Sequence, residues 1–281
     1  MYDDILIDAF SVKEKIITEN VVLLDTSWHL PTSERNAKKD YENGHIENAY
    51  FFDIDAMSQP DSAYPHTMPP SDWFAEKMGI LGFSDKDHYI LYDQSPLFSS
   101  ARVWWMLKNF GANNVQILNG GLNSWIEAGF SLSMQAPSAR DKATFCASSM
   151  QRSCVYYQDV YEALTNDAIQ ILDARSPARF SGKADEPRPG ISSGHMPSAL
   201  NLPFNLLLDD NGCMKPASEL EAIIEELGVS KSKPIITSCG SGVTAAVVFL
   251  ALTCLGYDDV SLYDGSWTEW ASTENAPIIK G

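Results

Sequence analysis

The stretch Lys233-Pro-Ile-Ile-Thr-Ser-Cys239-Gly-Ser-Gly-Val-Thr244, followed by an apolar run over 245–255, predicts a strand, a tight loop and a helix in direct succession. Ile235 and Ile236 are typical of a short buried strand, and the Ala- and Leu-rich run is long enough for a packed helix. A loop of this kind turns several backbone N–H groups inward, and the helix adds the positive end of its dipole.

Cys239 opens this loop, where both effects favour a lowered pKa and the reactive thiolate form. A lone cysteine is more often an inert buried residue, here beside Thr244 as a helix cap. Glycines on both sides of Ser241 favour the interpretation of Cys239 as a nucleophile instead. We therefore predict that Cys239 is a reactive thiol.

The 281 residues contain 20 Lys plus Arg against 37 Asp plus Glu, a formal net charge of −17. Nucleic acids and anionic membranes require a basic face, so neither is predicted as a partner. The N-terminal residues lack the pattern of a secretory signal. The most apolar run, 245–255, is too short to span a membrane.

The five cysteines form an odd set without a C-x-x-C pair, so neither a disulfide framework nor a zinc site is predicted. We expect no metal and no cofactor. We also expect a reducing, cytoplasmic setting, in which a free catalytic thiol survives. Four cysteines have no Gly-rich loop around them and are interpreted as structural or incidental: Cys146, Cys154, Cys213 and Cys254.

One pattern occurs twice along the chain. Gly194-His195 repeats Gly44-His45, and downstream a set of residues recurs at a constant offset: Gly111, Val115, Gly120 and Trp125 correspond to Gly256, Val260, Gly265 and Trp270. Two tandem copies of one fold are therefore predicted. In each copy, strands alternating with helices indicate an α/β domain with a mostly parallel sheet flanked by helices.

The chain length also suggests two domains, at roughly one domain per 150 residues. We predict an N-terminal domain over 1–132, a Ser- and Ala-rich linker over 133–153 and a C-terminal domain over 154–281. Ligands of such sheets gather at the carboxyl ends of the strands. There the first copy has Asp93-Gln-Ser-Pro-Leu-Phe-Ser-Ser100 in place of the Cys239 loop, so only the second copy is predicted to hold an active site.

Motifs spread over about 22–272 carry a family resemblance. They are Asp25-Thr-Ser-Trp28, Gly44-His45-Ile46, Phe51-Phe-Asp-Ile-Asp55, Arg102-Val-Trp-Trp-Met106, Asp173-Ala-Arg175, Glu186-Pro-Arg188, Gly194-His195, Cys239-Gly-Ser-Gly-Val-Thr244 and Tyr263-Asp-Gly-Ser-Trp267. The chain resembles the two-domain rhodanese-type sulfurtransferases, and the Cys-Gly-Ser-Gly-Val-Thr loop is specific for their 3-mercaptopyruvate-using branch. The resemblance implies two tandem rhodanese-like domains.

The implied mechanism is nucleophilic. The Cys239 thiolate attacks the sulfur of 3-mercaptopyruvate, pyruvate leaves as its enolate, and the thiol becomes a persulfide. Gly240, Gly242, Val243 and Thr244 are implied to hold the anionic sulfur through the loop amides. A thiol acceptor such as thioredoxin or a small dithiol, or cyanide in an assay, then removes the outer sulfur. The physiological acceptor and the oligomeric state stay open.

The resemblance also implies a proton relay. Ser241 is implied to work with His66 and Asp55 of the first domain, since an imidazole positioned by a carboxylate suits a shared proton near pH 7. Thr67 follows His66 and departs from the residue common in relatives.

Two arginines match the substrate-binding arginines of the family. Arg179 and Arg188 are implied to grip the substrate carboxylate, because a guanidinium binds a carboxylate through two parallel hydrogen bonds. The carboxylate of 3-mercaptopyruvate lies some atoms from its sulfur, so these cations are expected to stand off from the loop.

Three alternatives remain. A thiosulfate sulfurtransferase shares the fold and nucleophile, but its compact dianion is best held by cations beside the thiol, which residues 240–242 do not supply. A cysteine phosphatase needs an arginine at the end of its loop, where this chain has Ala245. A non-catalytic binding protein of this fold typically lacks the cysteine.

Overall fold

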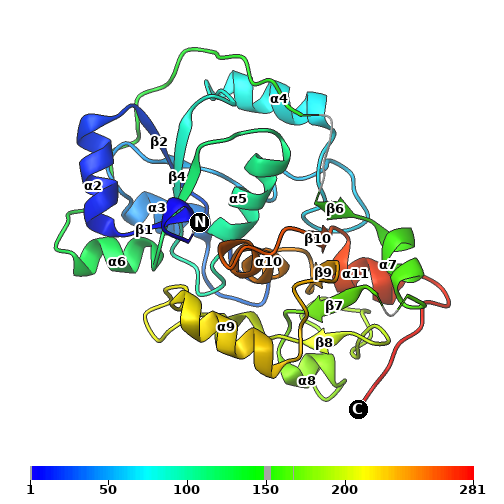
Figure 1. Cartoon of the computed structure of the whole chain (residues 1–281). Helices are drawn as coiled ribbons and strands as arrows, with labels where there is room; N and C mark the ends of the chain where they lie inside the picture. The colour runs from blue at the N-terminus through cyan, green and yellow to red at the C-terminus, as the bar shows by residue number, and fades with distance from the viewer. Residues whose placement is uncertain (1, 149–152, 167) are drawn as a thin grey trace.

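The computed structural model describes residues 2–148, 153–166 and 168–281, which form two α/β units (Figure 1). The first unit has a parallel sheet of order β1-β5-β4-β2-β3, with β1 (Leu6–Ile7), β2 (Val21–Asp25), β3 (Tyr50–Phe51), β4 (His88–Tyr92) and β5 (Val115–Leu118). The second has a parallel sheet of order β6-β10-β9-β7-β8, with β6 (Cys154–Val155), β7 (Gln170–Asp173), β8 (Leu200–Asn201), β9 (Ile235–Ser238) and β10 (Val260–Tyr263). Each strand of the first sheet has a counterpart at the same position in the second sheet. The predicted tandem repeat is therefore confirmed.

Helices flank both sheets, as the alternating pattern predicts. Those of the first unit are α1 (Tyr2–Ile5), α2 (Ala9–Thr18), α3 (Ala37–Asn43), α4 (Ser71–Ile80), α5 (Ser100–Asn109) and α6 (Gly121–Glu127). Those of the second are α7 (Tyr157–Ala163), α8 (Pro177–Phe180), the 3-10 helix η1 (Phe204–Leu207), α9 (Ala217–Glu226), α10 (Ala245–Cys254) and α11 (Ser266–Ser272). In the described part of the chain, no helix is long and apolar enough to cross a membrane.

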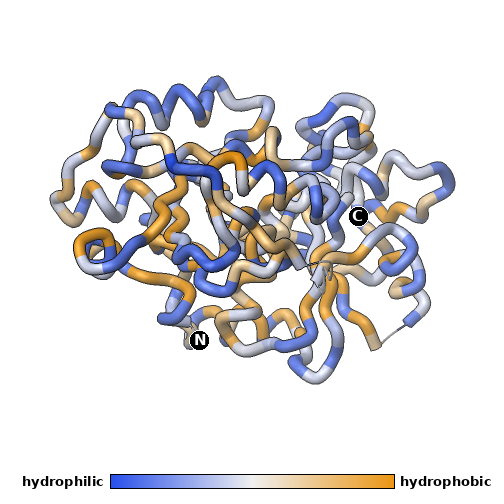
Figure 2. Tube along the Cα trace, turned by 90° about the horizontal axis from the view of Figure 1, so that it is seen from above, coloured by the Kyte–Doolittle hydropathy of each residue, from blue (hydrophilic) through white to orange (hydrophobic). Residues whose placement is uncertain are grey.

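The two units share one apolar core. Helix α10 is buried along nearly its whole length, as expected for a helix that is apolar on all sides. It packs against α5 of the first unit, where the rings of Trp104 and Phe249 lie 6.4 Å apart, and Figure 1 shows the two helices side by side. In Figure 2, many hydrophobic stretches run through the interior of the molecule, whereas many outer loops are hydrophilic. Because α5 and α10 pack together, residues of the first unit can be held firmly at a site in the second unit.

The Gly-His turns are structural in both copies. His45 Nδ1 lies 2.8 Å from Tyr41 O, and the two rings stack. His195 Nδ1 lies 2.9 Å from Phe180 O with the same stacking. Since the turn makes the same contacts in both units, and only the second unit has the Cys239 loop, its histidine serves the fold.

The described residues of the predicted linker pack along the first unit. Ser138 O accepts a hydrogen bond from Tyr50 at 2.8 Å, and Ala143 N donates to Gly79 O at 3.0 Å. Residues 149–152 of this linker lie outside the described residues. The segment over 133–148 therefore extends the surface of the first unit.

Candidate active site

Cys239 lies in the loop between β9 and α10, at the carboxyl end of the second sheet. The residue is buried, with 2% of its surface exposed. Two carbonyl groups anchor the loop to α11, because Trp267 N donates to Cys239 O at 2.9 Å and Thr268 N donates to Gly240 O at 3.0 Å. The loop is thus held in place without the N–H groups of the residues that follow Cys239.

Residues 240–244 form what we call the amide cradle. None of their N–H groups donates a hydrogen bond to a residue that the structure describes. Gly242 has a φ of +81°, a left-handed conformation that favours glycine, and Thr244 does not cap α10 with its side chain. Free backbone donors at the start of a helix make a favourable site for an anion.

His66 reaches this loop from the segment between β3 and α4 of the first unit. Its Nδ1 lies 3.0 Å from Ser241 Oγ, and its Nε2 lies 2.8 Å from Asp55 Oδ1. A carboxylate only accepts hydrogen bonds, so Nε2 carries the proton and Nδ1 accepts from the Ser241 hydroxyl. The structure thus brings together three residues that lie far apart in the sequence.

The electrostatics of this triad favour a neutral imidazole. His66 is 3% exposed, and burial lowers its pKa, while the hydrogen bond and charge of Asp55 oppose this shift. Arg102 and Arg188 lower the pKa of His66 further. The hydrogen bond from His66 lowers the pKa of Asp55, whose side chain is 66% exposed. Asp55 is therefore ionised and His66 neutral near pH 7.

Neighbouring side chains hold the triad. Trp28 Nε1 donates to the second Asp55 oxygen at 3.2 Å, and its ring meets the His66 ring edge-on. Thr67, the departure from the family pattern, donates to Ser62 Oγ at 2.8 Å and so fixes the loop that carries His66. Trp28 lies inside one of the matching motifs, but the sequence alone did not assign it a contact.

Arg179 lies on α8 and touches the amide cradle. Its Nη2 is 3.0 Å from the position that a Cβ would take on Gly240. An ion pair with Glu186 holds the Arg179 guanidinium in this position. Arg175 also donates a hydrogen bond to the Glu186 carboxylate, at 2.8 Å. The expectation that this cation stands off from the loop is therefore wrong, because Glu186 draws the guanidinium against it.

Arg188 is the less constrained of the two predicted arginines. It is partly buried and makes no hydrogen bond or ion pair with the described residues. Burial lowers its pKa, and the nearby charges of Cys239 and Asp55 oppose that shift. Its guanidinium is therefore available to an anionic ligand beside Cys239.

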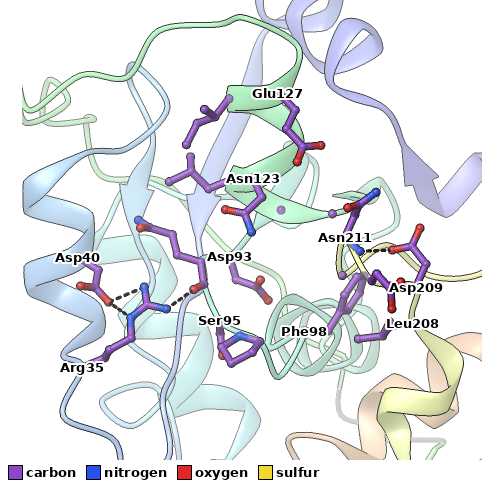
Figure 3. Close-up of a pocket in the computed structure, with 18 of the residues that line it drawn as sticks. Arg35, Asp40, Asp93, Ser95, Phe98, Asn123, Glu127, Leu208, Asp209 and Asn211 are labelled. Carbon is purple, nitrogen blue, oxygen red and sulfur yellow. Dashed lines mark hydrogen bonds and ion pairs between the residues drawn. The ribbon is translucent and has the colours of Figure 1, made fainter.

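A concave site lies in the first unit, at the carboxyl ends of β4 and β5 (Figure 3). This cavity of about 780 Å³ is lined by the segment that corresponds to the Cys239 loop, including Asp93 and Gln94. Asp209 and Asn211 of the second unit border it from the other side. It occupies the place of the active site in the first copy and has a carboxyl group where the second has a thiol.

Asp93 titrates abnormally in this cavity, which leads to a stability prediction. Burial raises its pKa from 3.8 to about 6, although Ser100 N donates to it at 2.8 Å. The stability that the protonated form contributes is complete below pH 3.8 and is lost as the pH rises through about 6. Asp93→Asn removes the charge, so above pH 6 it should raise the free energy of unfolding by about 1–3 kcal/mol.

Urea unfolding at pH 4 and pH 8 checks this prediction. The gain from Asp93→Asn should be small at pH 4 and full at pH 8. The matched control is Asp141→Asn, an exposed aspartate with no side-chain hydrogen bond to the described residues. Equal effects of the two variants at pH 8 would contradict the prediction.

A family model for the rhodanese-like domain matches residues 8–128 and again residues 157–273. The chain therefore belongs to the rhodanese family and carries two of its domains. It is similar to 3-mercaptopyruvate sulfurtransferase of Escherichia coli (strain K12), with 44% identity over 94% of each chain. The family, the fold class and the resemblance seen in the motifs are thus confirmed.

Two further relatives extend the comparison. Thiosulfate/3-mercaptopyruvate sulfurtransferase 1, mitochondrial, of Arabidopsis thaliana is 37% identical over 91% of this chain and 73% of the relative. The crystal structure of SseA from Escherichia coli, described as a 3-mercaptopyruvate sulfotransferase, superposes with a TM-score of 0.85 at 41% identity, over 93% of this chain and 98% of that chain. The protein is an enzyme of the sulfurtransferase class, so the interpretation as a non-catalytic binding protein is set aside.

Proposed function

We propose that this protein transfers sulfur from 3-mercaptopyruvate, through a persulfide on Cys239, to a thiol acceptor, and releases pyruvate. The observation that carries the proposal is the contact between His66 Nδ1 and Ser241 Oγ at 3.0 Å, inside the loop that begins with Cys239. It joins the amide cradle, whose own residues carry no charge, to a group that can transfer a proton. A substrate that must both lose and gain a proton needs such an arrangement.

The first step is attack of the Cys239 thiolate on the substrate sulfur. An S–S bond forms, and the bond between sulfur and carbon breaks, so that its electron pair leaves on the enolate of pyruvate. The proton of the substrate thiol is taken up and returned to the enolate carbon, which gives pyruvate and an anionic persulfide. The cradle amides of Gly240, Gly242, Val243 and Thr244 stabilise the sulfur anion in both states.

Ser241, His66 and Asp55 carry that proton in our proposal. The neutral imidazole accepts a proton through the Ser241 hydroxyl, and Asp55 stabilises the imidazolium that forms. In this way the proton of the substrate thiol is transferred to the enolate carbon over one short path. No cofactor is required, because the proton and the electron pair both remain within the substrate and these side chains.

Arg188 and Arg179 bind the substrate carboxylate in this proposal. Arg188 lacks a protein partner among the described residues and is therefore assigned the principal contact. Arg179 is already engaged by Glu186, so it adds positive potential at the cradle and a second donor. The carboxylate would thus be held at the side of the cradle where the two cations lie.

Mass spectrometry of the protein after exposure to 3-mercaptopyruvate tests the proposal. The peptide that contains Cys239 should gain the mass of one sulfur atom, with one pyruvate released for each protein chain. Cyanide should remove that mass as thiocyanate. An unchanged Cys239 peptide beside released pyruvate would show that the sulfur takes another route.

Thiosulfate is the second candidate donor. Arg179 lies against the cradle at Gly240, where a cation assists a compact dianion, and the Arabidopsis relative is named for both donors. Glu186 neutralises much of this charge, so we propose thiosulfate as the slower donor. Rates of persulfide formation with the two donors at equal concentration distinguish the alternatives.

The acceptor is proposed only as a class. A persulfide is attacked by a thiolate, so thioredoxin or a small dithiol fits the chemistry. A free nucleophilic thiol fits a reducing compartment such as the cytoplasm. We retain the domain division 1–132, 133–153 and 154–281 as part of the proposal.

A further inference from the structure

A buried ion pair joins the two units directly behind the amide cradle. Arg102 of α5 donates through Nη2 to Asp264 Oδ1, which follows β10, at 2.9 Å. The side chains are 0% and 3% exposed. The guanidinium also stacks over the Trp105 ring, with 4.5 Å between its central carbon and the ring centroid. The pair therefore lies in the shared core.

Both members of the pair hold the backbone that carries His66. Arg102 Nη2 donates a hydrogen bond to His66 O. On the other side, Met68 N donates to Asp264 Oδ2 at 2.7 Å. One charge from each unit thus grips the same short segment of the first unit.

That segment requires support because His66 has an unusual backbone conformation. Its φ is +63°, in the left-handed region that residues other than glycine rarely adopt. Such a conformation costs on the order of 1 kcal/mol or more and persists when the surroundings impose it. The contacts to His66 O and Met68 N are such surroundings.

The same guanidinium also packs against the cradle. A Cβ on Gly242 would lie 2.9 Å from Arg102 Nη1, so the loop and the arginine are in direct contact. Among the described residues, Arg102 Nε and Nη1 have no hydrogen-bond partner. Buried donors without partners destabilise a fold, so their presence here indicates that the placement of this charge serves the site.

We propose that Arg102 and Asp264 are positioning residues that hold His66 in line with Ser241 and Asp55. Neither side chain needs to touch the substrate. One member of the pair comes from each unit, and both bind the segment that carries His66. The relay is therefore complete only when the two units are docked. This inference rests on the proposed proton relay and adds to it the groups that orient the imidazole.

Asp264→Asn tests the Arg102–Asp264 pair, which we call the clamp, with little change in side-chain shape. The amide keeps one oxygen for Arg102 but turns an NH₂ group towards Met68 N, which has no acceptor to offer it. A relay displaced by a fraction of an ångström should release pyruvate about 10- to 100-fold more slowly in a single turnover. The concentration of 3-mercaptopyruvate at half-maximal rate should change less than about threefold, because Arg179 and Arg188 are untouched.

Two further variants calibrate this result. Asp87→Asn breaks the Arg140–Asp87 pair within the first unit, away from the relay, and should leave the rate unchanged. Arg102→Lys keeps the charge with a single donor group, so its rate should lie between those of the wild type and Asp264→Asn. Thermal unfolding identifies the variants that are folded. If Asp264→Asn does not fold, the rate of Arg102→Lys provides the test.

A double variant decides between positioning and general structural damage. If Asp264 acts through His66, then Asp264→Asn combined with His66→Gln should be no slower than His66→Gln alone. Losses that multiply would overturn the inference, as would an unchanged rate in both folded clamp variants or in His66→Gln. Failure of the proposed function itself is distinct, because the wild-type protein would then release no pyruvate from 3-mercaptopyruvate.

Discussion

Replacing Cys239 with serine is expected to lower the rate of pyruvate release from 3-mercaptopyruvate by about 10⁴-fold or more. Serine has nearly the same shape, but its hydroxyl stays protonated near pH 7 and is a much weaker nucleophile than a cysteine thiol. It also cannot form an S–S bond. The amide cradle, the relay and the two arginines stay in place, so the substrate should still bind. Single-turnover pyruvate release and mass spectrometry of the peptide that contains position 239 measure the loss.

The control for this variant is Cys146→Ser, since Cys146 is an exposed free cysteine outside the site. It should transfer sulfur at the wild-type rate. Cys239 is buried, so the free energy of unfolding of Cys239→Ser should be measured beside the rate. Sulfur transfer by a folded Cys239→Ser protein at more than about one hundredth of the wild-type rate would exclude this thiol as the nucleophile.

Replacing His66 with glutamine is expected to lower the rate with 3-mercaptopyruvate by about 10²- to 10³-fold, the usual contribution of a positioned acid–base group. Glutamine can occupy the same space and form hydrogen bonds, but it does not exchange a proton near pH 7. Thiosulfate provides the internal comparison. Its outer sulfur carries no proton and sulfite leaves as an anion, so this donor transfers sulfur without the relay. Persulfide formation from thiosulfate should change less than about threefold.

The acidic side of the pH profile should report the same residue. The charged groups around His66 are Asp55, which raises its pKa, and Arg102 and Arg188, which lower it, while burial lowers it most. Protonation removes the acceptor at Nδ1, so wild-type activity with 3-mercaptopyruvate should be kept on acidification past the ordinary value of 6.5 and lost only below it. His66→Gln should lack this acidic limb of the pH profile, that is, the loss of activity below pH 6.5. Equal slowing with both donors, or a limb unchanged in the variant, would exclude His66 from the relay.

The fold could be predicted from the sequence to a large extent. The recurrence of Gly111 and Trp125 as Gly256 and Trp270 predicts two equivalent units, and the structure has two sheets of the same strand order. A repeat is readable without coordinates because each unit needs its glycines and aromatic residues at the same turns and core positions. The strand before Cys239 and the helix after it were also placed correctly, since both are continuous apolar segments.

The candidate site was less accessible to such reasoning. Arg102 and Asp264 both lie in motifs that match the family, but nothing in their spacing indicates that they face each other across two domains. The position of Arg179 was predicted from the distance between the carboxylate and the sulfur of 3-mercaptopyruvate. It proved closer to the loop because Glu186, a few residues away in sequence, draws it inward. Pairwise electrostatics between loops cannot be predicted before the loops are placed.

The sequence by itself determined the tandem α/β architecture, the single Cys239 loop and its lack of charge at 240–242. These properties depend on local periodicity and on which residue types stand in one short segment. Only the tertiary structure decided that His66 meets Ser241 at 3.0 Å, and that one buried ion pair grips the backbone around it. Those contacts arise from the packing of two separate sheets against each other through α5 and α10, and hydrogen bonds across such an interface depend on distances that no local pattern encodes.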